Sequence, residues 1–309
     1  MPLYLSEDDV TSLVTPADAL TVIEDCFRRL AAGAVEIMPR RRFPVAGGYF
    51  AVMAAADTDL GVAGSKSYTL VDGKLRFLVC LFSLEDGTLE AVIEANKLGQ
   101  LRTGAASGVA AKYLARTESR TVGVIGCGWQ AESQLAAIRA AVPTIERAVV
   151  WCRTPERLAK FCKVNGAQPA EGAHEAAACD IVVTATTSKD PVLRGDWLRD
   201  GALVCAIGAN DPRSRELDTH VIARASFVCC DSIEDAKLES GDLIDPVATG
   251  QLDWLEVHEL QEVVAGEISG RQSDGDIVVF KSNGIAAWDI AIAHELVARA
   301  RERGVGRSL

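Results

Sequence analysis

The chain contains 309 residues, 49% of them hydrophobic, and carries a formal net charge of −11. Its length and apolar content suffice for one large domain or two ordinary ones with buried cores. The negative charge would repel nucleic acid backbones and anionic lipid surfaces, and the only basic run is Arg40 to Arg42, so we expect neither nucleic acid nor a membrane as a partner.

The N-terminal third combines one predicted helix with a predicted antiparallel sheet. Thr15 can cap a helix that begins at Pro16 and ends near Gly33, because the apolar residues between them follow helical spacing. From Tyr49 to Ile93 short β-like runs follow one another, separated by the turn-forming pairs Asp72-Gly73 and Asp86-Gly87. These runs predict antiparallel strands.

A different pattern begins at Thr121, where apolar strands alternate with helical stretches. The runs are TVGVI, RAVVWC, DIVVTAT, ALVCAIG, ASFVCC and IVVF. Six strands joined by crossovers predict an α/β protein with a doubly wound parallel sheet. The last helical segment, Ile285 to Arg303, follows this sheet, and we expect it to return to the N-terminal domain.

The first of these strands leads directly into a glycine-rich turn. Gly126, Gly128 and Ala131 form the pattern G-x-G-x-x-A between the strand TVGVI and the helix AESQLAAIRAA. In this setting the first glycine permits a tight turn and the second lets backbone approach a pyrophosphate. The alanine permits close packing of a helix whose N-terminus faces the negative charge. The turn therefore predicts a Rossmann-type dinucleotide site.

The end of the next strand indicates which dinucleotide binds. An acid usually holds the ribose hydroxyls of NAD there, but this strand ends in VVWCRTPER, and Cys152 occupies the place of the acid. Arg153 and Thr154 follow, a cation and a hydroxyl suited to a 2′-phosphate. We therefore expect NADPH rather than NAD as the cofactor. The alternative is that Arg153 is a solvated loop residue.

The cysteines and histidines show no pattern typical of a metal site. Nine cysteines are scattered without a C-x-x-C pair, which fits neither a disulfide framework nor a zinc site. Four of them lie in apolar runs and are expected to be buried small hydrophobic residues: Cys152, Cys205, Cys229 and Cys230.

The start of the chain lacks the basic-then-apolar order of a signal peptide, so a cytoplasmic location is expected.

Four ordered segments resemble the ornithine cyclodeaminase and mu-crystallin family: RTGAASGVAAKYLA, GVIGCGWQA, IGANDPRSRELD and VVFKSNGIAAWDIAIA. The resemblance extends over nearly the whole chain. It implies a homodimer whose subunits have a substrate-binding and dimerisation domain, 1–116 plus 285–309, with a Rossmann domain, 117–284, inserted in it. The family includes cyclodeaminases, archaeal alanine dehydrogenase and NADPH-dependent ketimine reductases.

The same resemblance assigns the residues of the site. Arg41 in MPRRRFP would bind the substrate carboxylate, with Arg40 as the alternative in this arginine run. Lys66 in GSKSYT would be the active-site lysine, unless it is a sheet-edge residue with only its stem buried, and Arg102 would join it at the carboxylate. Besides the glycine turn and the Cys-Arg-Thr strand end, further residues would contact the cofactor: Thr103, Trp129, Gln130, Thr186, Lys281 and Ser282.

One position departs from the family pattern. Cyclodeaminases and the alanine dehydrogenase carry an aspartate where this chain has Asn210, and an amide cannot act as a general base, although Asp211 is adjacent. We therefore expect Asn210 to orient the substrate or the nicotinamide in an enzyme that uses NADPH to reduce a C=N bond next to a carboxylate. The substrate would be a cyclic ketimine, such as pyrroline- or piperideine-2-carboxylate, or an open-chain imino acid.

Two other kinds of function stay open at this point. An ornithine cyclodeaminase or an amino-acid dehydrogenase would use the same cofactor site, although Asn210 and the Cys-Arg-Thr strand end argue against a cyclodeaminase. A non-catalytic, NADPH-dependent binding protein of the mu-crystallin type would need neither Lys66 nor Arg102 for chemistry. The presence of both residues favours catalysis.

Overall fold

The computed structural model describes residues 1–309 and divides into two compact units. The first unit contains Met1–Thr103 and Ile285–Leu309, and the second contains Gly104–Gly284. Helix α3 (Asn96–Leu114) contributes residues to both. The functional division into a substrate and dimerisation domain (1–116 with 285–309) and a dinucleotide-binding domain (117–284) remains a prediction.

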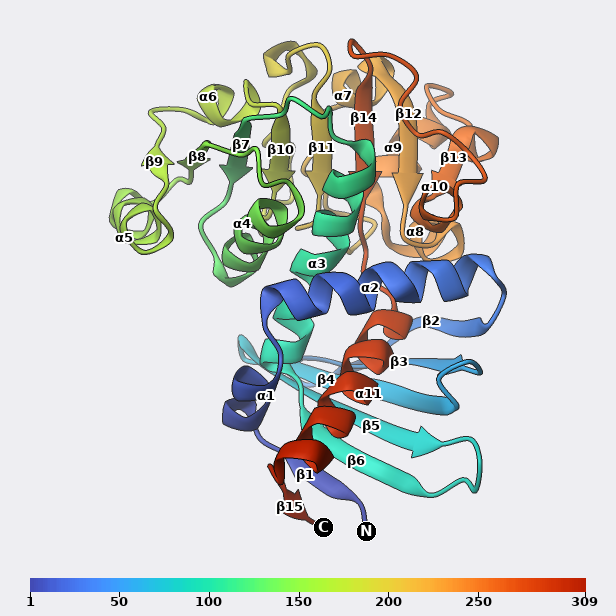
Figure 1. Cartoon of the computed structure of the whole chain (residues 1–309). Helices are drawn as coiled ribbons and strands as arrows, with labels where there is room; N and C mark the ends of the chain where they lie inside the picture. The colour runs from blue at the N-terminus through green and yellow to red at the C-terminus, as the bar shows by residue number, and fades with distance from the viewer. The chain divides into compact units, whose positions relative to one another are not determined.

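The first unit is built on a seven-stranded sheet of order β15-β1-β6-β5-β4-β3-β2 (Figure 1). Strands β3 to β6 pair antiparallel as expected, and β2, which precedes the expected range, pairs antiparallel with β3. Strand β1 pairs parallel with β6. Asp72 and Gly73, both with positive φ, form the two-residue turn between β4 and β5. The strands are β1 (Leu3–Leu5), β2 (Val35–Val45), β3 (Gly48–Asp57), β4 (Val62–Val71), β5 (Lys74–Ser83), β6 (Leu89–Glu94) and β15 (Arg307–Ser308).

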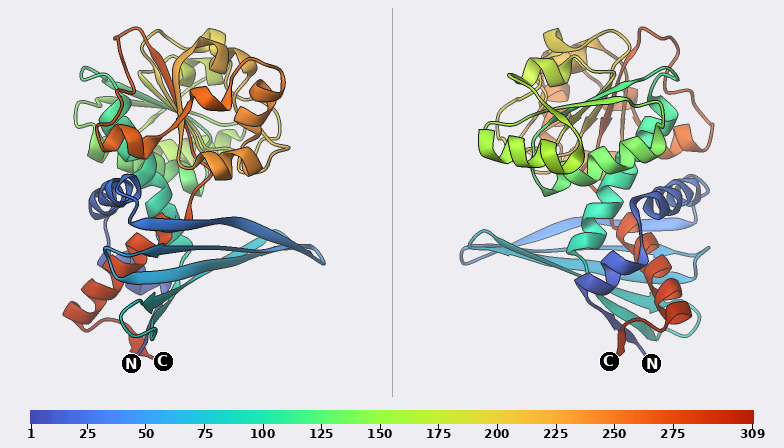
Figure 2. Two further views of the ribbon diagram at one scale, coloured as in Figure 1. Left: turned by 90° about the vertical axis from the view of Figure 1, so that its right-hand side faces the viewer. Right: turned by 60° about the vertical axis from the view of Figure 1, so that its left-hand side comes forward.

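Helix α11 (Ala286–Arg303) lies along one face of this sheet and packs against α2 (Pro16–Ala31), as both views of Figure 2 show. Helix α2 begins as predicted, because Thr15 and Asp18 form a reciprocal capping box at its N-terminus. The ring of Phe27 on α2 meets the indole of Trp288 on α11 edge to face, with centroids 5.5 Å apart. A short helix, α1 (Glu7–Leu13), precedes α2.

The other face of the sheet carries large apolar side chains that are exposed in the single chain. Phe43 on β2 and Phe50 on β3 are directly paired, and their ring centroids are 6.3 Å apart. The strand register places three more exposed side chains on this face. The apolar outer face consists of Met38, Phe43, Phe50, Leu78 and Phe82. Contiguous apolar surface of this kind typically marks an interaction site.

The second unit contains an eight-stranded sheet of order β13-β12-β14-β11-β10-β7-β8-β9, in which every strand pair is parallel. The six expected strands are all present, so the predicted doubly wound α/β sheet is confirmed. The strands are β7 (Thr121–Ile125), β8 (Arg147–Trp151), β9 (Gln168–Pro169), β10 (Ile181–Thr184), β11 (Leu203–Ala206), β12 (Ala225–Cys230), β13 (Val257–Glu259) and β14 (Ile277–Lys281).

Helical segments connect these parallel strands. They are α4 (Trp129–Ala141), α5 (Pro155–Asn165), α6 (Ala173–Ala177), α7 (Thr219–Arg224), α8 (Ile233–Glu239), α9 (Gly241–Ala248) and α10 (Leu260–Val264), with 3-10 turns η1 (Gly195–Trp197) and η2 (Trp254–Glu256). The chain runs outward from β7 to β9 and then returns to β10 on the other side of β7. This change of direction creates the switch point at which open α/β sheets bind ligands. None of the helices is long and apolar enough to cross a membrane.

Candidate functional site

The glycine turn lies between β7 and α4, at this switch point. Gly126 has a φ of 119°, and a Cβ at this position would lie 2.4 Å from the carbonyl oxygen of Ala185, so only glycine fits. A Cβ at Gly128 would meet no atom within 4 Å, so the space beside it is open. Gly128 also caps α4 without a side-chain hydrogen bond, which leaves the first N–H groups of the helix available to an anion.

A cavity of about 230 Å³ opens beside this turn. Five residues expected at the cofactor line it: Gly126, Gly128, Arg153, Thr154 and Thr186. Three others form the first turn of α4 and are not part of the lining: Trp129, Gln130 and Ala131. Ala131 is fully buried, as close packing of α4 requires. Thr103 belongs to the first unit, where its hydroxyl donates to the carbonyl of Gly99 at 2.7 Å.

Two arginines line the end of the cavity at β8. Arg153 follows the strand, and Arg157 lies four residues later in the first turn of α5. No Asp or Glu is part of the lining, so this end of the cavity is positively charged. Arg157 was not among the expected cofactor residues, although it is the second arginine of the same segment, CRTPER.

One cysteine expectation is wrong. Cys152 is not a buried small hydrophobic residue, because it forms a disulfide with Cys127, with Cα atoms 5.8 Å apart, and both residues line the cavity. The two cysteines are 25 residues apart and become neighbours only when β7 and β8 pair, so their spacing gave no warning. The other three cysteines are fully or almost fully buried, as expected: Cys205, Cys229 and Cys230.

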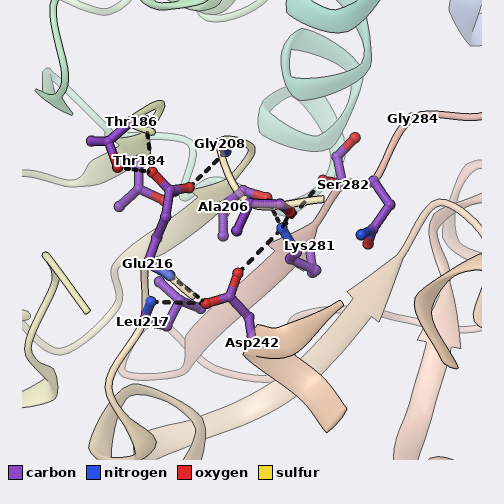
Figure 3. Close-up of polar contacts among 12 residues, drawn as sticks. Thr184, Thr186, Ala206, Gly208, Glu216, Leu217, Asp242, Lys281, Ser282 and Gly284 are labelled. Atoms are coloured by element: carbon purple, nitrogen blue, oxygen red, sulfur yellow. Dashed lines mark hydrogen bonds and ion pairs between the residues drawn. The ribbon is translucent and has the colours of Figure 1, made fainter. Parts of the chain in front are cut away.

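A buried carboxylate holds the loops at the carboxyl edge of the sheet (Figure 3). Glu216 Oε1 accepts hydrogen bonds from the N–H and the hydroxyl of Thr186, at 2.7 and 2.8 Å. Its Oε2 accepts from the hydroxyl of Thr184 at 2.8 Å and from the N–H of Gly208 at 2.6 Å. Burial raises the pKa of Glu216. Glu216 therefore fixes Thr186, and with it one wall of the cavity.

Lys281, expected at the cofactor, makes internal contacts in the structure. Its ammonium is fully buried and donates to the carbonyl of Ala209 at 2.5 Å. The ammonium also lies 3.2 Å from Asp242 Oδ2 (Figure 3). Asp242 Oδ1 in turn accepts from the N–H groups of Glu216 and Leu217. Because its hydrogen bonds are directed to these internal groups, Lys281 supports the loop after β11, and it is not part of the cavity lining. A contact with the cofactor stays a prediction.

Ser282 has a comparable supporting contact. Its hydroxyl donates to Asp231 Oδ2 at 3.0 Å, and the same oxygen accepts from the N–H groups of Asn283 and Gly284. Asp231 is buried, and burial raises its pKa. Asp231 thus fixes the turn that follows β14, and Ser282 is part of that turn.

Asn210 and Asp211 lie on the loop after β11. Asn210 is exposed and directly follows Ala209, the residue whose carbonyl Lys281 binds. The two carboxylate oxygens of Asp211 accept from Nε and Nη2 of Arg213, both at 2.9 Å. Asp211 is therefore paired with Arg213, a largely exposed side chain, on the surface of this loop.

The first unit contains a buried cluster of cations around one carboxylate. Lys66 is 2% exposed, and its ammonium donates to Asp289 Oδ1 at 2.8 Å. Arg102 Nε lies 3.3 Å from the same oxygen, while its buried Nη1 has no hydrogen-bond partner. Lys66 lies on the interior strand β4, so the alternative of a sheet-edge lysine is wrong.

Arg40, not Arg41, faces this cluster. A β-bulge between Met38 and Arg41 places two residues of β2 opposite one residue of β3. As a result Arg40 is 7% exposed and its Nη2 lies 3.8 Å from Met53 Sδ, next to Lys66 in the register, whereas Arg41 is exposed on the outer side. Of the two arginines considered for the substrate carboxylate, Arg40 is thus the one that lies beside Lys66, and its role at the carboxylate stays a prediction.

The electrostatics of the cluster make Lys66 unusual. Burial, followed by the like charges of Arg102 and Arg40, lowers the pKa of Lys66 to about 8, although Asp289 opposes the shift. The ammonium also lies 4.7 Å from the ring centroid of Phe77. Lys66 and Arg102 share the single carboxylate of Asp289, which leaves an excess of positive charge, so the cluster is suited to bind an anionic group.

Comparison with known proteins identifies the family. Residues 2–304 match the model of the ornithine cyclodeaminase/mu-crystallin family. The chain belongs to this family. Among its relatives in the family, alanine dehydrogenase of Archaeoglobus fulgidus is 35% identical over 99% of this chain and 98% of its own. Delta(1)-pyrroline-2-carboxylate reductase of Bacillus cereus is 37% identical over 84% of this chain and 83% of its own.

A solved structure of the family is similar over the whole length. Delta(1)-pyrroline-2-carboxylate reductase of Thermococcus litoralis, in complex with NADH and L-proline, has a TM-score of 0.94 and 33% identity, with 99% of this chain and 100% of that chain covered. The family assignment made from the four sequence segments is thus confirmed.

Four supporting acids were missed by the sequence analysis, because nothing in the sequence marked them: Glu216, Asp231, Asp242 and Asp289.

Proposed function

We propose that this protein is an NAD(P)-dependent oxidoreductase that reduces a C=N bond next to a carboxylate, with NADPH as the preferred cofactor. The observation that carries this proposal is the buried cation cluster, whose positive charge exceeds that of its single carboxylate, Asp289. A pyrroline-2-carboxylate reductase and an alanine dehydrogenase are among the relatives, and the C=N bond of an imino acid is common to both chemistries.

The cluster would hold the substrate carboxylate. Arg102 has an unpartnered Nη1, and Lys66 keeps two further ammonium protons besides the one directed at Asp289. Arg40 would complete the set of cations. Charge-assisted hydrogen bonds from these buried cations would fix the orientation of the substrate, which hydride transfer to the carbon of a C=N bond requires. The dinucleotide supplies the hydride; the protein supplies position and charge.

The cavity of the second unit would hold the dinucleotide. The open space at Gly128 and the uncapped start of α4 suit a pyrophosphate. Arg153 and Arg157 suit the 2′-phosphate that distinguishes NADPH, and no carboxylate lines the cavity to select the free ribose hydroxyls. The Thermococcus litoralis relative was solved with NADH, so the preference of this chain depends on these two arginines.

A second function, amino-acid dehydrogenase, is favoured by the Archaeoglobus fulgidus relative. It would differ only in the source of the imine, which forms from a keto acid and ammonia instead of arriving as a ring. A cyclodeaminase is disfavoured because Asn210 cannot take a proton.

We further propose a homodimer formed through the apolar outer face. Its five exposed side chains, including Phe43 and Phe50, lie on one surface of the first unit's sheet. A second copy that covers this face would remove the apolar area from water in both subunits, and a two-fold axis would match the face to itself.

The cofactor proposal predicts that NADPH binds at least roughly tenfold more tightly than NADH, since a charge-assisted hydrogen bond contributes about 1.5 to 3 kcal/mol. Arg153→Ala and Arg157→Ala should each weaken NADPH binding and leave NADH binding nearly unchanged. Calorimetric titration of both dinucleotides measures this. Arg147→Ala, at the other end of β8, is the matched control. Equal dissociation constants in the unsubstituted protein would refute the assignment.

The carboxylate proposal predicts that Lys66→Met lowers kcat/KM by at least about a hundredfold, or about 2.7 kcal/mol, without changing dinucleotide affinity. In the unsubstituted protein kcat/KM should fall above pH about 8, because the Lys66 ammonium loses its proton there. Asp289→Asn should move this fall to lower pH, since the carboxylate raises the pKa of Lys66. Pre-steady-state and steady-state rates over a pH series provide the measurement.

Lys66→Arg also tests whether Lys66 is the group that titrates, because a guanidinium keeps its proton throughout the pH series. The alkaline fall should disappear in this variant if it folds with a measurable rate. Lys160→Arg, an exposed lysine on α5, should retain the profile of the unsubstituted protein. Persistence of the fall in an active Lys66→Arg variant would show that another group titrates.

The reaction proposal predicts loss of NADPH absorbance with cyclic imino acids, and no comparable release of ammonia from ornithine with either cofactor. The physical reason is that reduction of an existing C=N bond needs no general base at position 210. Asn210→Asp is the companion variant for the ammonia assay. Robust ammonia release by the unsubstituted protein would establish a cyclodeaminase, and no turnover of any imine would favour a binding protein.

The dimer proposal predicts a mass twice the chain mass of 32.9 kDa by light scattering at micromolar concentration. Phe50→Asp should produce a folded monomer, because it buries a charge in the proposed interface. Val164→Asp, at an exposed position on α5 of the second unit, is the control and should remain dimeric. A mass of one chain for the unsubstituted protein would contradict the proposal.

A further inference from the structure

We propose that the Cys127–Cys152 pair is a redox-controlled latch of the dinucleotide cavity, which binds tightly when the disulfide is closed and weakly when it is reduced. This inference rests on the proposed dinucleotide site but goes beyond it, because a redox response is no part of imine reduction. It assigns a reversible covalent modification to a defined pair of residues.

The position of the disulfide is the first observation. Cys127 lies between Gly126 and Gly128, and Cys152 is the first residue after β8. Both line the cavity, together with Arg153. The bond therefore connects the turn that would bind the pyrophosphate to the strand end that would bind the 2′-phosphate.

The glycine content of the turn is the second observation. Gly126 and Gly128 have no side chains that could pack and hold the turn in place, and glycine has the greatest backbone freedom. Within the turn, Gly126 N–H donates to the carbonyl of Trp151 at 2.8 Å, and Gly128 provides no side-chain cap for α4. The disulfide adds a covalent restraint at the residue between the two glycines.

The disulfide should favour binding because it restricts the residues that line the cavity before the ligand arrives. The two sulfur atoms bond to each other, so neither side chain can rotate into the space of the ligand. After reduction two thiols must separate to van der Waals contact, and both the side chains and the turn regain conformational freedom. The ligand must then restrict that freedom on binding, which weakens its affinity.

The other cysteines are poor competitors for the same chemistry. Burial raises the pKa of Cys26 and of Cys205 to about 12, and burial likewise raises the pKa of the half-buried Cys80. Thiolates are the reactive form, so these groups react slowly at neutral pH. The seven free cysteines also lie outside the cavity lining. A mild dithiol or disulfide reagent would therefore act first at the Cys127–Cys152 pair.

The redox step is an ordinary thiol–disulfide exchange. A thiolate of a dithiol reductant attacks one sulfur of the disulfide and releases the other cysteine as a thiolate, which takes up a proton. The second thiol of the reductant then resolves the mixed disulfide. Two electrons and two protons pass to the pair, giving two cysteine thiols and the oxidised reductant. A disulfide oxidant such as oxidised glutathione reverses the exchange.

The test compares NADPH affinity of the full-length protein before and after treatment with dithiothreitol, with the reagent removed before titration. Thiol counts in denaturant should rise from seven to nine on reduction. We expect the dissociation constant for NADPH to rise at least about tenfold, and oxidised glutathione to restore it. Bound NADPH should slow the reduction of the disulfide, because binding and closure favour each other.

Variants separate the latch from a general effect of the reagent. Cys127→Ser and Cys152→Ser should each bind NADPH like the reduced protein and should not respond to dithiothreitol. Cys80→Ser, a free cysteine on β5, is the matched control and should respond like the unsubstituted protein. Circular dichroism should show that all three variants keep the fold.

Each contrary outcome has a distinct meaning. Equal affinities of the oxidised and reduced forms, or weaker binding by the oxidised form, would overturn the latch while the dinucleotide site would stand. A count of nine thiols after treatment with oxidised glutathione would overturn it by showing that the bond does not form. Failure of both forms to bind NADPH and NADH would overturn the dinucleotide site itself, and the latch with it.

Discussion

The ion pair between Lys66 and Asp289 is the contact on which the first unit depends. The two residues are 223 positions apart, and both are buried. An uncompensated charge in such a place costs several kcal/mol, so the lysine on the inner face of the sheet requires α11 to return from the end of the chain. Helix α11 then covers that face and brings Trp288 against α2. One contact thus links the closure of the fold to the charge that the proposed reaction needs.

The second unit must also compensate buried charges, but there most of them are negative. Its buried charges are mostly carboxylates, and they are balanced by backbone N–H groups as well as by a cation. Glu216, Asp242 and Asp231 together accept from loop residues that follow β10, β11 and β14. Hydrogen bonds to charged groups are stronger than those between neutral groups, so the buried carboxylates hold these loops in place from the interior of the unit. The surface that would meet a ligand is therefore shaped by residues that do not touch it.

The local features of this fold could be predicted from the sequence, because each depends on a few neighbouring residues. Thr15 and Asp18 determine the start of α2, Asp72 and Gly73 determine a hairpin turn, and Gly126 accepts a backbone angle that other residues avoid. Periodic apolar runs in the sequence likewise predicted the six main strands of the parallel sheet. Features that depend on pairing between distant segments were missed or misplaced. The bulge in β2 that turns Arg40 inward has no sequence signature, and the fully buried environment of Lys281 exists only once β11 and β14 are neighbours.

Because the first unit is assembled from both ends of the chain, its completion is tied to the order of synthesis. Residues 1–103 emerge early, yet Asp289 is made 186 positions after Thr103, on the order of tens of seconds later at roughly 5–20 residues per second. During that interval all of residues 104–284 are available, so the parallel sheet can form while Lys66 still lacks its carboxylate. The inner sheet face of the first unit can therefore acquire its α11 cover only after the whole second unit has been synthesised.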